Sequence, residues 1–199
     1  MLELGAGNGY FASLLLRRFS GQTPERLIIS DQSQSLLDIA QTEFYLSSAD
    51  YQRIDVQEPL PFADNSVDLI LAIMLLNELP TSYAQKAVVE CARLLRESGQ
   101  LLAAVPHPAF VQALAKKGAL TDFGRGLFAM PSTDGLRLPV AHRPADAYLT
   151  LLTGAGFQAA SEDVFANDAI RHEKPGLSVG RDVPLALLFD CRKQSAARP

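Results

Sequence analysis

Apolar residues in this chain gather in short segments that alternate with amphipathic stretches. The short segments predict buried strands at 1–4, 27–30, 51–55, 67–74 and 101–105. Between them, apolar positions recur at helical spacing, which predicts helices that include 34–46 and 82–96. Regular alternation of strand and helix predicts an α/β fold: an open, mostly parallel sheet with helices on both faces.

The regular alternation of predicted strands and helices ends after residue 105. Segment 106–142 is rich in proline and glycine and has one helical stretch, 109–117, so we interpret it as an insertion or lid. A helix from Pro144 to about 153 and strands at 157–165 and 184–191 then complete the chain. We therefore expect one domain over 1–199, with a ligand-binding half at 1–105, the insertion at 106–142 and a C-terminal helix and strand pair at 143–199.

Composition narrows the range of partners. The 199 residues are 48% hydrophobic and 20% charged, as in ordinary globular domains, and the net charge of −4 offers no basic field for nucleic acid. The longest apolar run, 69–76, is too short to cross a membrane, and the N-terminus has no export signal, so we expect a cytoplasmic protein. Cys91 and Cys191 have no neighbouring ligands, so no metal site is expected.

Three features in the first half point to nucleotide chemistry. Gly5-Ala6-Gly7-Asn8-Gly9 lies between a strand and a helix, where glycines allow a sharp turn and close approach of a ligand. Asp31 ends the second strand, where a carboxylate can accept hydrogen bonds from ribose hydroxyls. Asp55 ends the third. Each has a plainer alternative: a tight connection for the glycines, a helix cap for Asp31 and a solvated turn for Asp55.

Together these residues resemble the class I S-adenosylmethionine-dependent methyltransferases, in particular the small-molecule group. The match covers residues 1–105 and includes Glu3-Leu4-Gly5-Ala6-Gly7-Asn8-Gly9, the stretch 61–68 and the stretch 90–102. The resemblance implies a Rossmann-like, doubly wound sheet of seven strands, mostly parallel, with an antiparallel last strand and an insertion after the fifth. It implies S-adenosyl-L-methionine as cofactor, bound by Glu3, Gly5, Ala6, Gly7, Gly9, Asp31, Gln32, Asp55, Val56 and Ala72.

The chain departs from the family pattern in two places. Glu97-Ser98-Gly99-Gln100 stands where Lys-Pro-Gly-Gly is common, and its single glycine should leave the turn intact. Family members carry about forty or more residues before the glycine loop, including a covering helix, and this sequence begins inside the first strand. We therefore expect an open cleft beside the glycine loop, and a homodimer is one arrangement that would cover it.

The expected reaction is methyl transfer to a small-molecule acceptor by in-line displacement. The cofactor supplies an activated methyl group, so the protein mainly aligns the acceptor and no metal is required. A hydroxyl or protonated amine acceptor would need a general base, for which His107 is the first candidate, whereas a carboxylate would need none. Asn77 and Glu78 follow the fourth strand and are candidates for orienting the acceptor. The alternative for His107 is a stacked or solvated loop histidine. The alternative for Asn77 and Glu78 is capping of the helix that follows.

Two other functions stay open at the level of sequence. A nicotinamide-dependent oxidoreductase shares the strand, glycine loop and ribose carboxylate, but its loop would have the pattern GxGxxG, and Tyr10 occupies the position of the last glycine. A degenerate methyltransferase fold could instead act as a binding or interaction module. Turnover of any acceptor would exclude the second alternative.

Overall fold

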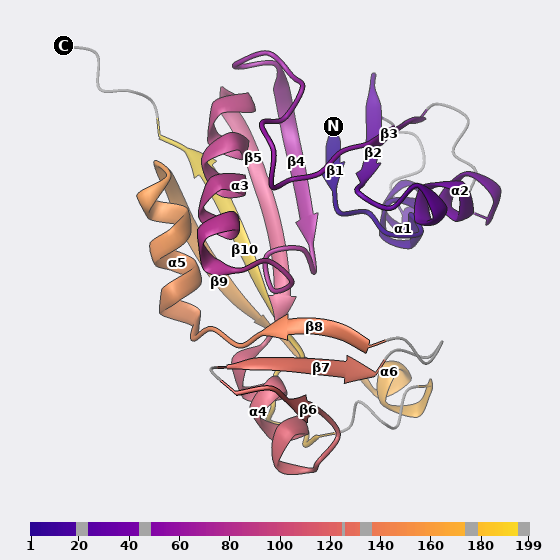
Figure 1. Cartoon of the computed structure of the whole chain (residues 1–199), viewed down its shortest axis with the longest axis vertical. Helices are drawn as coiled ribbons and strands as arrows, with labels where there is room; N and C mark the ends of the chain where they lie inside the picture. The colour runs from indigo at the N-terminus through magenta and orange to yellow at the C-terminus, as the bar shows by residue number, and fades with distance from the viewer. Residues whose placement is uncertain (19–23, 44–48, 125, 132–136, 174–178, 195–199) are drawn as a thin grey trace.

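The computed structural model describes residues 1–18, 24–43, 49–124, 126–131, 137–173 and 179–194. Its main feature is a seven-stranded sheet with the order β3-β2-β1-β4-β5-β10-β9 (Figure 1). The strands are β1 (Leu2–Leu4), β2 (Leu27–Asp31), β3 (Ala49–Arg53), β4 (Val67–Ile73), β5 (Leu95–Pro106), β9 (Phe157–Val164) and β10 (Ala186–Lys193). β1 to β5 are parallel, and β10 runs antiparallel to β5 and β9. The expected fold class is confirmed.

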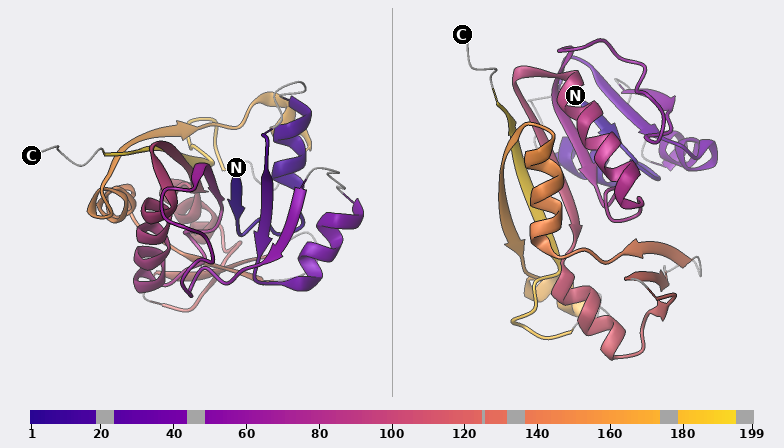
Figure 2. Two further views of the ribbon diagram at one scale, coloured as in Figure 1. Left: turned by 90° about the horizontal axis from the view of Figure 1, so that it is seen from above. Right: turned by 60° about the vertical axis from the view of Figure 1, so that its left-hand side comes forward.

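Helices cover both faces of this sheet, as the view from above shows (Figure 2). Val88 of α3 and Leu152 of α5 belong to one core cluster with Leu4 and Leu101 of the sheet. Leu37 of α2 packs in a second cluster on the other face. The helices are α1 (Tyr10–Arg18), α2 (Gln34–Glu43), α3 (Thr81–Leu94), α4 (Pro108–Lys116), α5 (Ala145–Gly154) and α6 (Asp168–Glu173).

β1 is the central strand and decides where a ligand can bind. It pairs with β2 on one side and β4 on the other, and Leu2 and Leu4 are completely buried. The direction of winding reverses between β1 and β4, and in such sheets ligands bind outside the carboxyl ends of the strands at this point. The glycine loop, which follows Leu4, lies at that position.

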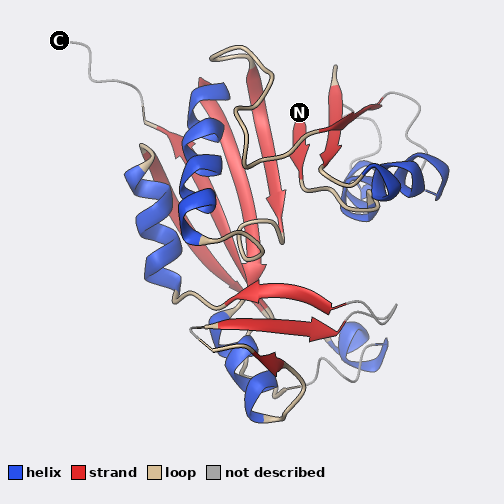
Figure 3. Ribbon diagram, in the orientation of Figure 1, coloured by secondary structure: helices blue, strands red, loops and turns tan. Residues whose placement is uncertain are grey.

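The insertion differs from the sequence-based expectation. Besides α4 it contains a three-stranded antiparallel sheet of β6 (Thr121–Asp122), β7 (Leu127–Pro131) and β8 (Arg137–Ala141), below the main sheet in Figure 3. The sequence predicts only the helical stretch 109–117 in this segment and does not predict these strands. Pro139 lies on β8, an edge strand of this small sheet, where a residue without an N–H is tolerated.

The connection from α3 to β5 also differs. The helix was expected to end at 96 and the strand to begin at 101, but α3 ends at Leu94 and β5 begins at Leu95. Pairing with β4 shifts from Val67↔Leu95 to Leu69↔Gln100. The register therefore advances by five residues along β5 and by only two residues along β4. The expected glycine turn is therefore a bulge inside the strand pairing, which periodicity alone does not reveal.

Smaller differences occur elsewhere in the chain. β3 ends at Arg53, two residues before Asp55, and α6 was not expected. Residues 44–46 of the second expected helix lie outside the described part of the chain. Within the described ranges, no helix has the length and apolar character needed to cross a membrane.

Candidate active site

Two glycines of the loop after β1 are required by close packing. Gly5 has φ +64°, and a Cβ atom on it would lie 2.8 Å from Leu75 Cδ1. Gly9 has φ +77°, and a Cβ there would lie 2.9 Å from Cβ of Ala40 in α2. Any larger residue would collide as well as strain the backbone. These contacts bring the loop against both the segment after β4 and the second helix.

Gly7 differs from its two neighbours because its open side faces no described protein atom. Its φ is +57°, and nothing among the described residues lies within 4 Å of the position that a Cβ would occupy. Its amide N–H donates to Asp31 Oδ2 at 2.8 Å. The exposed backbone of Gly7 beside a carboxylate is a surface that a ligand can approach closely.

Asp31 is held at the end of β2 by backbone N–H groups of two neighbouring segments. It is 8% exposed at the end of β2, and Oδ1 accepts a hydrogen bond from the N–H of Ser33 just before α2. Each carboxylate oxygen thus accepts one N–H and keeps acceptor capacity for ribose hydroxyls. The carbonyl of neighbouring Gln32 accepts from Arg53 Nε, which joins the ends of β2 and β3.

Glu3 is a buried carboxyl group in the middle of the sheet. It is 1% exposed, and its Oε2 has no hydrogen-bond partner among the described residues. Burial raises the pKa of Glu3 from its usual value near 4.5 to about 7. A buried acidic group at this depth suits a cationic ligand, which would compensate its charge.

The remaining cofactor candidates occupy different environments. Asp55 is exposed, and its Oδ1 accepts from the N–H of Gln57, as in a turn, whereas Val56 is buried. Ala72 lies in the core cluster on the face that α3 and α5 cover. Its side chain is therefore committed to packing.

The loop between β4 and α3 carries Asn77 and Glu78. Asn77 is 3% exposed, and its Oδ1 has no partner among the described residues. Partial burial, and then the negative charge of Asp31, raise the pKa of Glu78 to about 7. The influence of Asp31 shows that the structure brings Glu78 near the expected ribose site.

His107, the first candidate for a general base, is held by the protein through both ring nitrogens. Nδ1 accepts from the N–H of Ala109 at the start of α4, and Nε2 lies 3.3 Å from Asp163 Oδ1. These contacts favour helix capping for His107. Glu78, with its pKa near neutrality, is better suited to accept a proton at pH 7.

Two residues at the site were missed in the sequence. Leu75 supports Gly5, and Arg143 contacts the β4–α3 loop from the segment that follows the insertion. Leu75 has no chemical signature. Arg143 could have drawn attention as a charged residue before a Pro-started helix, but its partners are more than sixty positions away.

The residues of the site fit S-adenosylmethionine. The buried Glu3 suits the cationic part, the open backbone of Gly7 leaves room for the methionine portion, and Asp31 retains acceptors for the ribose. Among the described residues, no group of three or more His, Cys, Asp or Glu is arranged to hold a metal ion. The chemistry available is alignment, hydrogen bonding and acid–base exchange.

The part of the chain that forms this site matches a known family. Residues 2–103 match the methyltransferase domain family, about half of the chain. Together with the sheet order and glycine loop, this match defines a class I S-adenosylmethionine-dependent methyltransferase fold. The chain belongs to the methyltransferase domain family, whose cofactor is S-adenosylmethionine.

Similar proteins agree with this assignment. Malonyl-[acyl-carrier protein] O-methyltransferase of Methylococcus capsulatus is 37% identical over 103 residues, which cover 51% of this chain and 35% of the relative. The chain thus spans about a third of that relative's length. An S-adenosylmethionine-dependent methyltransferase of Mesorhizobium loti has a TM-score of 0.70 at 18% identity, with 96% and 90% of the two chains covered. A Methanosarcina mazei structure of the same class has a TM-score of 0.71 at 16% identity, with 98% and 92% covered.

The first prediction uses the open side of Gly7. Gly7→Ala should weaken binding of S-adenosylhomocysteine at least ~10-fold, about 1.4 kcal/mol, because the methyl group enters the space left for the ligand. The matched control is Gly118→Ala, since Gly118 also has positive φ and no described atom within 4 Å of its Cβ position. Both variants should lose a similar ~1–2 kcal/mol of stability to backbone strain. Calorimetric titration that finds equal affinity for both variants would contradict a ligand site at Gly7.

The second prediction follows from the buried carboxyl of Glu3. Its folded-state pKa of about 7 lies above the usual 4.5, so the folded state binds a proton more tightly, and this contribution to stability is lost as pH rises from about 4.5 to 7. Glu3→Gln should therefore stabilise the cofactor-free protein at pH 8, on the order of 2 to 3 kcal/mol, and much less at pH 5. Thermal unfolding at both pH values measures this, with the exposed Glu25→Gln as control. A Tm gain independent of pH would refute the burial argument.

Proposed function

We propose that this protein transfers the methyl group of S-adenosylmethionine to a small-molecule acceptor. The observation that carries the proposal is the open face of Gly7, whose N–H is held by Asp31 at the carboxyl end of the central strands. That arrangement combines close backbone approach with a carboxylate for a ribose. The family match over 2–103 supports the same reading.

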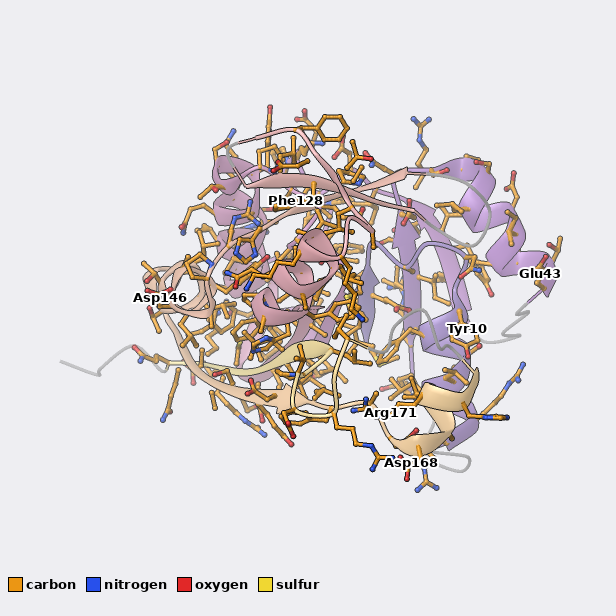
Figure 4. All side chains as sticks on the ribbon, turned by 90° about the horizontal axis from the view of Figure 1, so that it is seen from below. Tyr10, Glu43, Phe128, Asp146, Asp168 and Arg171 are labelled. Atoms are coloured by element: carbon orange, nitrogen blue, oxygen red, sulfur yellow. The ribbon has the colours of Figure 1, made fainter. Side chains whose placement is uncertain are left out.

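The acceptor approaches from the side of the insertion. α4 and the small sheet of β6, β7 and β8 lie below the carboxyl ends of β4 and β5 (Figure 1). In the view from below, the small sheet with Phe128 and helix α6 with Asp168 and Arg171 lie on opposite sides of α4 (Figure 4). These elements follow the cofactor half and supply the surroundings in which an acceptor would be selected.

Glu78 is our candidate for the proton acceptor. Methyl transfer to a hydroxyl or protonated amine releases a proton, and a group with a pKa near 7 takes it up efficiently at neutral pH. Glu78 has this pKa and lies within the electrostatic influence of Asp31. The Oδ1 of Asn77, which has no partner among the described residues, would orient the acceptor by a hydrogen bond.

The relative from Methylococcus capsulatus suggests a second acceptor chemistry. Its name describes O-methylation of a malonyl group on an acyl-carrier protein. A carboxylate acceptor is already a nucleophile and needs no base, so in that case Glu78 would be dispensable. Removal of Glu78 therefore distinguishes acceptor classes as well as testing its role.

The direct experiment is a screen for turnover. The protein is incubated with S-adenosylmethionine carrying a labelled methyl group and with panels of hydroxylated, amino, carboxylic and carrier-protein-bound acyl acceptors. Acceptor-dependent release of S-adenosylhomocysteine, with transfer of the label, is the expected result. Cofactor binding without turnover of any panel member would favour a binding module instead.

A third prediction concerns Asp31. Asp31→Ala should weaken S-adenosylhomocysteine binding at least ~10-fold, because hydrogen bonds to a charged carboxylate contribute about 1.5 to 3 kcal/mol each. Asp38→Ala, at an exposed position on the following helix, is the matched control and should bind normally. Calorimetry on both variants decides the question. Unchanged affinity in Asp31→Ala would remove this residue from the cofactor site.

The fourth prediction concerns Glu78 and pH. For a hydroxyl or amine acceptor, the rate should rise as pH increases through about 7, because only the ionised carboxylate accepts a proton. Glu78→Gln should lower kcat by about 10²-fold or more and remove this dependence. Initial rates between pH 5.5 and 9 measure both effects. An unchanged profile in Glu78→Gln would assign the proton to another group or identify an acceptor that needs no base.

A further inference from the structure

The loop from Met74 to Pro80, between β4 and α3, has few hydrogen bonds of its own. Met74 has φ +58°, a strained value for a residue with a side chain, and its N–H donates to the carbonyl of Ala104 on β5. Within the loop, the N–H of Glu78 donates to the carbonyl of Leu75. The carbonyls of Leu76, Asn77 and Leu79 therefore depend on donors from elsewhere.

Those donors all come from the short segment that leaves the insertion and enters α5. The N–H of Ala141 donates to the carbonyl of Asn77 at 2.7 Å. Arg143 Nη1 donates to the carbonyl of Leu76 at 2.8 Å, and Nη2 donates to that of Leu79. Ala141 and Arg143, which lie more than sixty positions after the loop in the sequence, thus donate hydrogen bonds to three of its carbonyls.

Arg143 is unusual as a buried charge. It is 7% exposed, and no ion pair joins it to a carboxylate in the described part of the chain. Its Nε donates to Thr81 Oγ1 at 3.2 Å, and its guanidinium carbon lies 5.6 Å from the centre of the Tyr148 ring. A buried guanidinium is costly unless its donors are used, and here the donors serve the β4–α3 loop.

The same loop contacts the cofactor side of the site. Leu75 packs against Gly5 so closely that Gly5 cannot carry a side chain. Glu78 is influenced by Asp31, and the buried Oδ1 of Asn77 has no partner among the described residues. The loop therefore connects three groups, namely the glycine loop, the proposed proton acceptor and the segment that carries Arg143.

We propose that Arg143 is a positioning residue for methyl transfer, which holds the β4–α3 loop so that Asn77 and Glu78 face the acceptor. This inference rests on the proposed function, and it links the insertion, which surrounds the acceptor, to the cofactor half. Arginine is needed because one planar group bonds two carbonyls and a hydroxyl at once. A lysine ammonium keeps the charge but cannot reproduce the planar arrangement of donors that reaches all three acceptors.

The test compares Arg143→Leu with Arg143→Lys, and Arg96→Leu serves as the matched control. Arg96 pairs with Asp68 on the surface near the start of β4, outside the candidate site. The chain has three methionines, so ¹³C labelling of their methyl groups gives a simple NMR spectrum. The signal of Met74, assigned by its loss in Met74→Leu, reports on the conformation of the loop. Hydrogen exchange of 74–80, calorimetry with S-adenosylhomocysteine and steady-state kinetics complete the measurements.

Arg143→Leu should shift or broaden the Met74 signal and speed exchange of 74–80 at least ~10-fold. It should lower kcat at least ~10-fold, while KM for S-adenosylmethionine and the affinity for S-adenosylhomocysteine change less than ~3-fold, because Asp31 and Gly7 are untouched. Arg143→Lys should recover part of kcat, and Arg96→Leu should match the unmodified protein. If Arg143→Leu does not fold, Arg143→Lys and Thr81→Val, which removes one partner of the guanidinium, must show smaller changes of the same kind.

The outcomes distinguish a failure of the role of Arg143 from a failure of the proposed function. If the unmodified protein binds S-adenosylhomocysteine and Arg143→Leu keeps its Met74 signal, loop exchange and kcat, the role of Arg143 is wrong and the proposed function stands. If the loop loosens while kcat per folded molecule is unchanged, Arg143 is only structural and the inference is again overturned. Absence of cofactor binding and turnover in the unmodified protein overturns the proposed function itself.

Discussion

The close packing of the glycine loop is the constraint on which the rest of the site depends. Leu75 packs against Gly5 and Ala40 packs against Gly9 at distances that exclude a side chain, so the loop is fixed both against the segment after β4 and against α2. The hydrogen bond from Gly7 to Asp31 then fixes its open face beside the end of β2. The three glycines have similar φ angles but different roles. Gly5 and Gly9 allow close packing, and Gly7 leaves space for a ligand.

Acidic groups give this space its electrostatic character. Glu3 and Glu78 both have pKa values raised to about 7, chiefly by burial, and Asp31 lies between the glycine loop and α2. Such a site costs the free protein stability, because its carboxyl groups resist ionisation. A cationic cofactor would relieve that cost on binding. Placement of strained or unpaired groups where a ligand compensates them is typical of functional sites.

The insertion is coupled to this site through hydrogen bonds to backbone carbonyls of the β4–α3 loop. Ala141 and Arg143 satisfy carbonyls of the β4–α3 loop, and that loop supports Gly5 through Leu75. A change in the position of the insertion would therefore reach the groups expected to face the methyl acceptor. This arrangement gives the insertion a physical route to influence chemistry carried out by the cofactor half.

The sequence by itself determined the alternating sheet, the glycine loop and the place of Asp31 at the end of the second strand, because periodicity and glycine spacing are local properties of the chain. Only the tertiary structure decided that Gly7, unlike Gly5 and Gly9, faces open space, that His107 is held by Ala109 and Asp163, and that Arg143 reaches Leu76 and Leu79. It also decided the strands of the insertion, where Pro139, tolerated on the edge strand β8, concealed the pairing. Burial, unpartnered atoms and long-range contacts arise only when distant segments meet, so no local pattern could reveal them.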